Sequence, residues 1–145
     1  MALGTFTLTT TAKQYISDGT IDLDTDTFKC AIVTSASNIA VGSTIYSALT
    51  SELTTANGYT AGGVTLTTPT YTAAVWKTAN FSWTASGGNI VGRFLVFYKS
   101  GTANAIVNPI LGFCLLDATP ADLTITNGST TTFQADPTNG WFKAV

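Results

Sequence analysis

The residues best suited to chemistry are four aspartates near the N-terminus: Asp18, Asp22, Asp24 and Asp26. The last three alternate as in the first half of a calcium-binding loop, where carboxylates at alternate positions ligate the ion. Such a loop needs glycine at its sixth position and glutamate at its twelfth, but this chain has Thr27 and Val33 there. An irregular calcium site remains the alternative. We expect a solvated loop that leads into a strand, and no metal.

Other catalytic groups are scarce. The chain has no histidine, which removes the usual base for serine and cysteine nucleophiles and the commonest metal ligand. Its only glutamate is Glu52, and nothing in the sequence places a second carboxylate beside it for glycoside hydrolysis. A hydrogen bond within its own loop is the expected role of Glu52. We therefore expect no enzyme, no catalytic residue and no cofactor.

Two cysteines, Cys30 and Cys114, each lie inside an apolar run. They form either a disulfide between strands or two buried thiols that act as small hydrophobic residues. The first ten residues have neither a basic start nor an apolar stretch of the kind that directs secretion. We expect the chain to fold in a cytoplasm, with both thiols reduced and buried.

Charge and the length of the apolar stretches exclude two further classes of partner. Charged residues make up only 10% of the 145-residue chain, and the net charge is −2. The six basic residues are scattered singly, whereas binding to nucleic acid needs a basic face. No stretch approaches the 18 apolar residues of a membrane-spanning helix. We expect neither nucleic acid nor a membrane as a partner.

The aromatic residues have two interpretations. Trp76, Trp141 and Tyr71 are candidates for a sugar-stacking face, which would make the chain a carbohydrate-binding module. Trp83 alternates with Phe81, which is typical of a strand with one buried face. Trp76 is expected at a turn and Trp141 near the C-terminus, so these two are the candidates for exposed or interfacial positions.

The elements that position these residues are mainly strands. Twenty-nine threonines, together with valine, isoleucine and aromatic residues, favour β-structure, and turn signals recur every 8 to 15 residues. Residues 11–18 allow one short helix, with Thr10 or Thr11 as its cap and Gly19 at its end. We predict an all-β chain: a two-sheet antiparallel β-sandwich, jelly-roll-like or immunoglobulin-like, with a closed barrel as the minor alternative.

Expected strands cover residues 5–9, 27–34, 64–68, 70–75, 80–84, 90–99, 106–116, 123–126, 130–135 and 141–144. Gly87-Gly88-Asn89 is typical of a hairpin turn, and Pro109 limits the first part of its strand to an edge or a bulge. The predicted core contains Phe28, Ile32, Phe81, Trp83, Phe94, Val96 and Leu115. The paired glycines of Tyr59-Thr60-Ala61-Gly62-Gly63 predict a turn with positive φ.

Several of these motifs resemble a family of small virion proteins of tailed bacteriophages. Asp26–Ser35 (DTFKCAIVTS) is similar to that family's DTFKVALLTS opening. Tyr46–Thr50, Glu52 and Gly58–Leu66 follow in the order of its YSDLT…E…GYTAGGVTL segment, except that Ala48 stands where aspartate is expected. Asn80–Trp83 and Phe94–Tyr98 then resemble later strands of the family, so the likeness spans roughly residues 19–115.

The resemblance implies a virion structural protein, and within that class a head decoration or cement protein on the outer surface of the capsid. The implied partner is the major capsid protein, and a homotrimer is the expected oligomer by analogy. A neck, tail or fibre-attachment protein is the alternative. We expect an extended N-terminal arm over residues 1–10 and one sandwich domain over 11–145. The expected contact residues are Ala2, Leu3, Phe6, Leu8, Trp76, Trp141 and Phe142.

Overall fold

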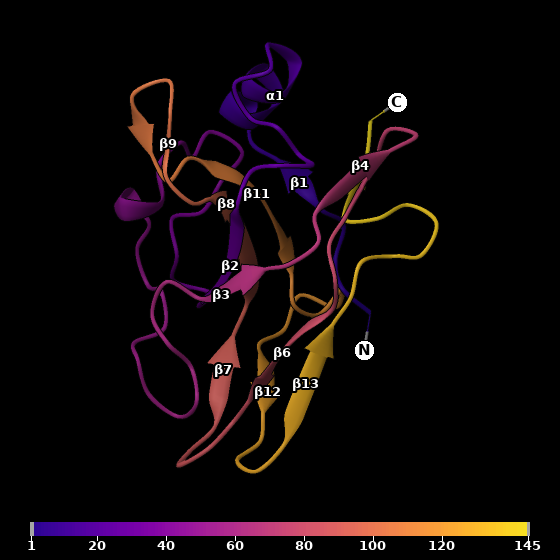
Figure 1. The fold of residues 1–145 in the computed structure, drawn as a ribbon. Helices are drawn as coiled ribbons and strands as arrows, with labels where there is room; N and C mark the ends of the chain where they lie inside the picture. Colours follow the sequence, from indigo (N-terminus) through magenta and orange to yellow (C-terminus); the bar gives the residue numbers. More distant parts are fainter. Residues whose placement is uncertain (1, 145) are drawn as a thin grey trace.

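The computed structural model describes residues 2–144, which form short antiparallel strands and one short helix (Figure 1). The helical elements are α1 (Thr10–Ser17) and the 3-10 turn η1 (Tyr46–Ala48). The strands are β1 (Thr7–Leu8), β2 (Phe28–Val33), β3 (Val64–Leu66), β4 (Thr70–Thr72), β5 (Val75–Lys77), β6 (Phe81–Thr84), β7 (Ile90–Gly92), β8 (Phe94–Lys99), β9 (Thr102–Ala103), β10 (Ile106–Val107), β11 (Ile110–Leu115), β12 (Leu123–Ile125), β13 (Thr130–Phe133) and β14 (Phe142–Lys143).

The main sheet has five antiparallel strands in the order β1-β11-β8-β2-β3. Its three central strands have the most apolar sequences of the chain, because both of their faces are largely covered. One face packs against the other strands of the molecule. The opposite face carries a smaller cluster around Val33, Val96 and Ile110, covered by Ile39, Tyr46 and Leu49.

Three small sheets form the second layer: β14-β5-β4, β13-β6 and β12-β7. In Figure 1, β6, β7, β12 and β13 occupy the lower part of the molecule, while α1 and β4 lie at its upper end. The predicted all-β, antiparallel, sandwich-like fold is confirmed. The second layer is divided, however, because short strands with frequent turns do not join into one continuous ladder.

Two predicted strands are each broken in the structure. The expected strand over residues 90–99 changes sheet at Arg93, so that β7 pairs with β12 whereas β8 pairs with β2 and β11. At this crossing a Cβ on Gly92 would lie 2.2 Å from Ile32 Cγ2, so only glycine fits there. The strand expected over residues 106–116 breaks before Ile110, because Pro109 cannot donate a ladder hydrogen bond.

Two turns differ from expectation. Gly87 has φ of +85°, but β6 and β7 on either side of its turn pair with β13 and β12, so they do not form a hairpin with each other. The strand expected over residues 70–75 is instead the first half of the β4–β5 hairpin. Its turn residues Ala73 and Ala74 have φ of +53° and +64°. The turn contains no glycine, proline, asparagine or aspartate, so the sequence did not indicate the reversal.

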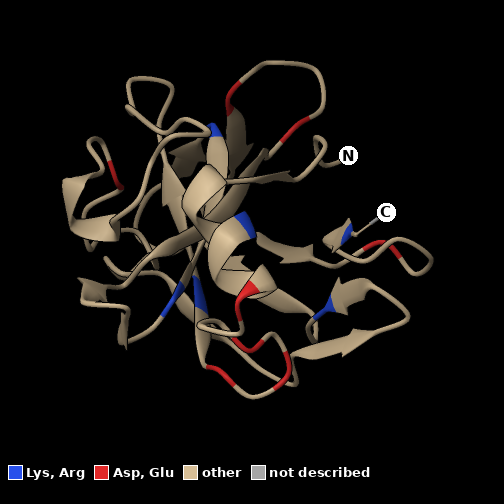
Figure 2. Cartoon of the chain, turned by 90° about the horizontal axis from the view of Figure 1, so that it is seen from above, with Lys and Arg blue, Asp and Glu red and all other residues tan. Residues whose placement is uncertain are grey.

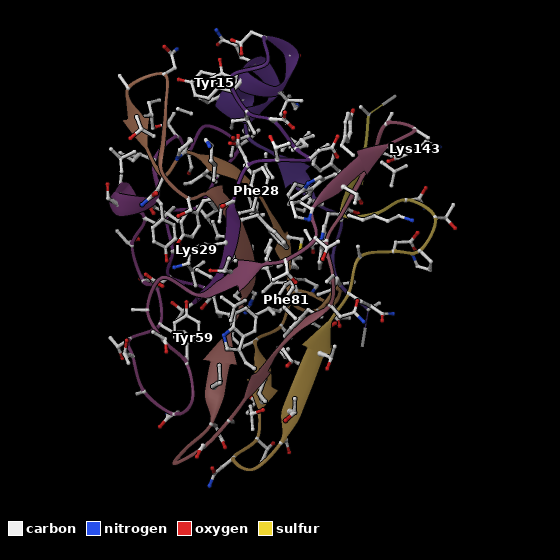
Figure 3. The ribbon with its side chains drawn as sticks, in the orientation of Figure 1. Tyr15, Phe28, Lys29, Tyr59, Phe81 and Lys143 are labelled. Carbon is white, nitrogen blue, oxygen red and sulfur yellow. The ribbon has the colours of Figure 1, made fainter. Side chains whose placement is uncertain are left out.

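Aromatic side chains fill the space between the two layers (Figure 3). Phe97 of β8 is fully buried, and its ring centre lies 4.8 Å from that of Trp141, 6.2 Å from Trp76 and 6.3 Å from Phe81. Of the predicted core residues, the buried ones are Phe28, Ile32, Trp83 and Val96. Those that are only half-buried are Phe81, Phe94 and Leu115.

Residues 2–9 are extended, but they lie along the chain's own strand β11 rather than free of the domain. The Gly4 N–H donates to Leu115 O at 2.9 Å, and β1 continues this pairing. The Phe6 ring then lies 5.1 Å from Phe97, edge to face. Without β1 this edge of β11 would be unpaired, so the segment and the sheet edge satisfy each other within the same chain.

Helix α1 begins one residue earlier than predicted. Thr9 is its cap: the side-chain oxygen accepts a hydrogen bond from the Ala12 N–H and donates one to Ile110 O. The fully buried Thr9 therefore ties the helix to the main sheet. The helix ends at Ser17 with Asp18 as its C-cap, and Gly19 follows with the predicted role and a φ of +75° that suits glycine.

The packing of Phe6 predicts that the N-terminal segment stabilises the fold. Phe6→Ala should lower the free energy of unfolding by about 3 kcal/mol, because a large ring is removed from contact with the core. Urea unfolding followed by tryptophan fluorescence measures this change. Thr5→Ala, at the exposed neighbouring position, is the control and should change stability little. Equal stability of the two variants would refute the assigned packing.

The β4–β5 turn predicts a stabilising substitution. Ala74→Gly should raise the free energy of unfolding by about 1 kcal/mol, because glycine adopts positive φ without the steric cost that alanine has. Ala36→Gly is the matched control at an exposed turn residue outside the left-handed region, and should destabilise the protein. Thermal unfolding of both variants makes the comparison, and a loss of stability in Ala74→Gly would contradict the turn geometry.

Candidate functional site

The sole glutamate holds two loops together. Glu52 follows η1, and its Oε1 accepts hydrogen bonds from the Tyr59 hydroxyl at 2.9 Å and from the Gly62 N–H at 2.5 Å. The Tyr59 oxygen also accepts a bond from the Ile32 N–H of β2 at 3.0 Å. These contacts link the loop before residue 53, the loop after residue 58 and the main sheet, and they confirm the expected loop hydrogen bond of Glu52.

Two more tyrosines complete this cluster. Tyr46 of η1 stacks on Tyr98 of β8 with ring centres 4.0 Å apart. The Tyr98 hydroxyl donates to Gly62 O at 2.7 Å, whereas the buried Tyr46 hydroxyl has no hydrogen-bond partner among the described residues. Burial, and to a smaller extent the Glu52 charge, raise the pKa of Tyr98 to about 12. We call Tyr46, Glu52, Tyr59, Gly62 and Tyr98 the loop anchor.

The paired glycines make the loop anchor possible. Gly62 and Gly63 have φ of +90° and +69°, as the sequence predicted. A Cβ on Gly63 would lie 1.8 Å from Cys30 O, so the loop can approach β2 this closely only with glycine. Lys29 of β2 and Tyr59 lie on the same side of the molecule in Figure 3. The sequence did not show that Glu52 and Tyr98 would both bond to Gly62. The one available signal was a lone glutamate in a chain with few charges.

The Asp22–Asp26 segment is a turn whose carboxylates bond to the chain itself. Asp22 Oδ1 accepts hydrogen bonds from the N–H groups of Asp24 and Thr25, which hold its pKa below the ordinary value. Asp26 pairs with Lys99 Nζ at 2.5 Å. Among residues 2–144, no three cysteine or acidic side chains are close enough to share a metal ion. Figure 2 shows the acidic residues on loops and the basic residues dispersed between them.

Both cysteines are free thiols and both are buried, as predicted. Cys30 of β2 and Cys114 of β11 pack within the main core. Burial raises the pKa of Cys114 to about 12, because an apolar environment disfavours the thiolate. These thiols therefore act as core residues.

The expectation that Trp76 and Trp141 are exposed is wrong. Trp76 is fully buried in β5, and its Nε1–H donates to Leu23 O at 3.1 Å. Trp141 is only 7% exposed, and its Nε1–H donates to Thr78 Oγ1. Both indoles satisfy their single donor inside the core, so they cannot stack on a sugar as the carbohydrate-binding interpretation requires.

The other predicted contact residues divide by exposure. Phe142 is buried at 9% and stacks against Phe6 with ring centres 5.5 Å apart. Leu3, Phe6 and Leu8 are half-buried against the core, and Ala2 is exposed. The N-terminal and C-terminal contact residues therefore meet in one place, but mainly to pack on each other.

A groove lies between the two chain ends. It has a volume of about 790 Å³, and one wall is residues 2–6. The other wall comprises residues 132–137 and 139–141, and Cys114 contributes to the lining. We call this the terminal groove. The contact residues expected from the sequence include parts of the first wall but none of residues 132–137. No local pattern shows that these segments face one another.

Comparison with known proteins adds no assignment. No family model, no curated protein and no solved structure matches the chain. Within residues 2–144, no helix has both the length and the apolar character that crossing a membrane requires.

The loop anchor predicts a specific loss of stability. Tyr59→Phe should lower the free energy of unfolding by about 2 kcal/mol, because the buried Ile32 N–H and the Glu52 carboxylate both lose a partner. Tyr71→Phe is the control, because the hydroxyl of this half-buried tyrosine forms no hydrogen bond among residues 2–144. It should leave the free energy of unfolding almost unchanged. Chemical unfolding measures both variants. If Tyr59→Phe matched Tyr71→Phe, the anchor would not hold the loops.

Proposed function

We propose that this chain is a virion structural protein of a tailed bacteriophage, and that it decorates the outer surface of the head. The observation that carries the proposal is the loop anchor. Tyr46, Glu52, Tyr59, Gly62 and Tyr98 all belong to the motifs that resemble the phage family. In this fold Glu52 bonds to Tyr59 and Gly62, and Tyr98 bonds to Gly62 and stacks on Tyr46. The residues that match the family's motifs thus serve one structural purpose. This supports a likeness in structure to the phage family, and not only a similar amino-acid composition.

The chemistry of the described residues supports a structural role. Glu52 and the Asp22–Asp26 carboxylates bond to the chain's own backbone and side chains, and the two thiols are buried. The low charge of the chain also suits extensive contact with neighbours, because each ion buried in an interface costs free energy of desolvation.

The proposed mechanism is thermodynamic. A protein that binds the assembled shell, but not its separate subunits, stabilises the shell by mass action. The proposed partner is the major capsid protein, and a homotrimer at three-fold positions is the proposed arrangement, by analogy with decoration proteins. Many weak contacts repeated over a lattice then add to a large total effect.

Reconstitution tests the proposal. Purified protein is mixed with phage particles that lack the corresponding gene product, and bound copies are counted by quantitative gel analysis and cryo-electron microscopy. We expect hundreds of copies on the head and a higher temperature of genome release, because occupancy stabilises the shell. The Tyr71→Phe variant, whose stability should be unchanged, is the control. It should bind in the same number of copies as the unchanged chain.

Two outcomes would contradict the head assignment. About a dozen copies at the neck or tail would replace it with the neck-or-tail alternative. Full occupancy of the head without any change in genome release would leave a surface protein that does not reinforce the shell.

A further inference from the structure

We propose that the terminal groove binds one extended, uncharged segment of a partner chain, which adds as a strand between the two walls of the groove. The inference deepens the proposed function in one respect only: on the phage head, the partner would be the major capsid protein. The binding chemistry itself depends only on the walls and lining of the groove.

The N-terminal wall of the groove has peptide groups without a partner among residues 2–144. The Gly4 N–H donates to Leu115 O at the end of β11, and the Ala2 carbonyl accepts from the Ala118 N–H just beyond it. The N–H and carbonyl groups of Leu3 and Thr5 have no recorded partner among residues 2–144, and both residues line the groove. An extended segment with free peptide groups is a template for another strand.

The opposite wall has the same property. Strand β13 pairs with β6 through residues 130–133. Directly after it, Gln134 and Ala135 line the groove, and their N–H and carbonyl groups have no recorded partner in the described chain. Each wall therefore contains peptide groups without a partner among residues 2–144, and such groups are free to pair with an added strand.

The groove carries little charge. Among residues 2–144, Asp136 is the only charged residue that lines it. Its Oδ1 accepts hydrogen bonds from the N–H groups of Thr138 and Asn139 at 2.9 and 2.6 Å, so its own loop already engages it. Apolar lining comes from Phe6, Phe133 and other residues. An acidic segment would lose hydration here and be repelled by Asp136, and a basic segment would find only a carboxylate that its own loop already engages. An uncharged segment is therefore the complementary occupant.

A partner chain suits the groove better than a second copy of this protein does. The uncharged extended segment at the N-terminus, residues 2–9, already pairs with β11 and packs through Phe6 against Phe97. A second copy would have to detach this segment from its own core before offering it to a neighbour. A partner with a free segment has no such cost.

The test uses a synthetic probe peptide, acetylated and amidated, in which three Thr-Val pairs lie between Ser-Gly and Gly-Ser ends. Its binding to the full-length protein is followed by amide chemical shifts in two-dimensional NMR. We expect shifts concentrated at residues 3–6 and 132–141. A second peptide with lysine in place of each valine should bind at least tenfold more weakly, because its charges would be desolvated.

A matched pair of variants tests the backbone itself. Gln134→Pro removes the free N–H of one wall, whereas Gln134→Ala keeps it and removes only the side chain. The proline variant should bind the probe about fivefold to tenfold more weakly, as expected for one lost hydrogen bond. The alanine variant should bind as the unchanged protein does. Thermal unfolding verifies that both variants fold, and the lysine peptide tests the proposal independently of either variant.

The proposal is overturned if millimolar probe causes no shifts at these residues, if the lysine peptide binds equally well, or if the shifts centre on the opposite sheet edge at β3. Self-association through the groove, detected by sedimentation, would overturn the choice of a partner chain. Attachment to phage heads without probe binding would refute the groove but not the head assignment. Probe binding without attachment to heads would do the reverse.

Discussion

The fold depends on the contacts that converge on the ring of Phe97. The three small sheets of the second layer are separate hydrogen-bonded units, so backbone pairing does not hold them against the main sheet. Phe97 lies in β8 and contacts Trp76 of β5, Phe81 of β6 and Trp141. Buried aromatic contacts thus hold the second layer against the main sheet. The contact of Phe6 with Phe97 also holds the N-terminal segment in place.

The loop anchor holds the long chain between β2 and β3 against the main sheet. Apolar residues of this chain contribute to both clusters: Tyr59 lies in the main core, and Ile39 and Leu49 cover the smaller cluster. Glu52 adds charge-assisted hydrogen bonds to Tyr59 and Gly62, and Tyr98 of β8 adds a bond to Gly62. These residues belong to the motifs on which the proposed phage function is based, so that proposal concerns how a loop surface is held against the sheet.

The two chain ends connect these structural features to the proposed function. Residues 2–6 and 132–141 are fixed by the aromatic core on one side, yet they leave peptide groups unpaired along the terminal groove on the other. A rigid wall with free donors and acceptors loses little conformational entropy when a strand binds. A protein that reinforces a lattice needs this property, because each site contributes a modest free energy that is repeated many times.

The sequence by itself determined the features that depend on local conformation. Threonine-rich alternation indicated β-structure, and Gly19 marked the end of the helix within one residue of its true cap. The Gly62-Gly63 pair predicted positive φ, and the apolar runs around Cys30 and Cys114 predicted buried thiols. Each of these depends on a few neighbouring residues, whose steric and solvation preferences are similar in any context.

Only the tertiary structure decided which segments meet. Trp76 and Trp141 looked suited to a surface, yet they became core residues because Leu23 O and Thr78 Oγ1 accept their N–H groups. Alternating residues near the N-terminus predicted a strand but not the strand with which it pairs, which is β11 of the same chain. Glu52 found its partners from 7 to 10 residues away. Contacts of this kind depend on the packing of the whole chain, which no local pattern encodes.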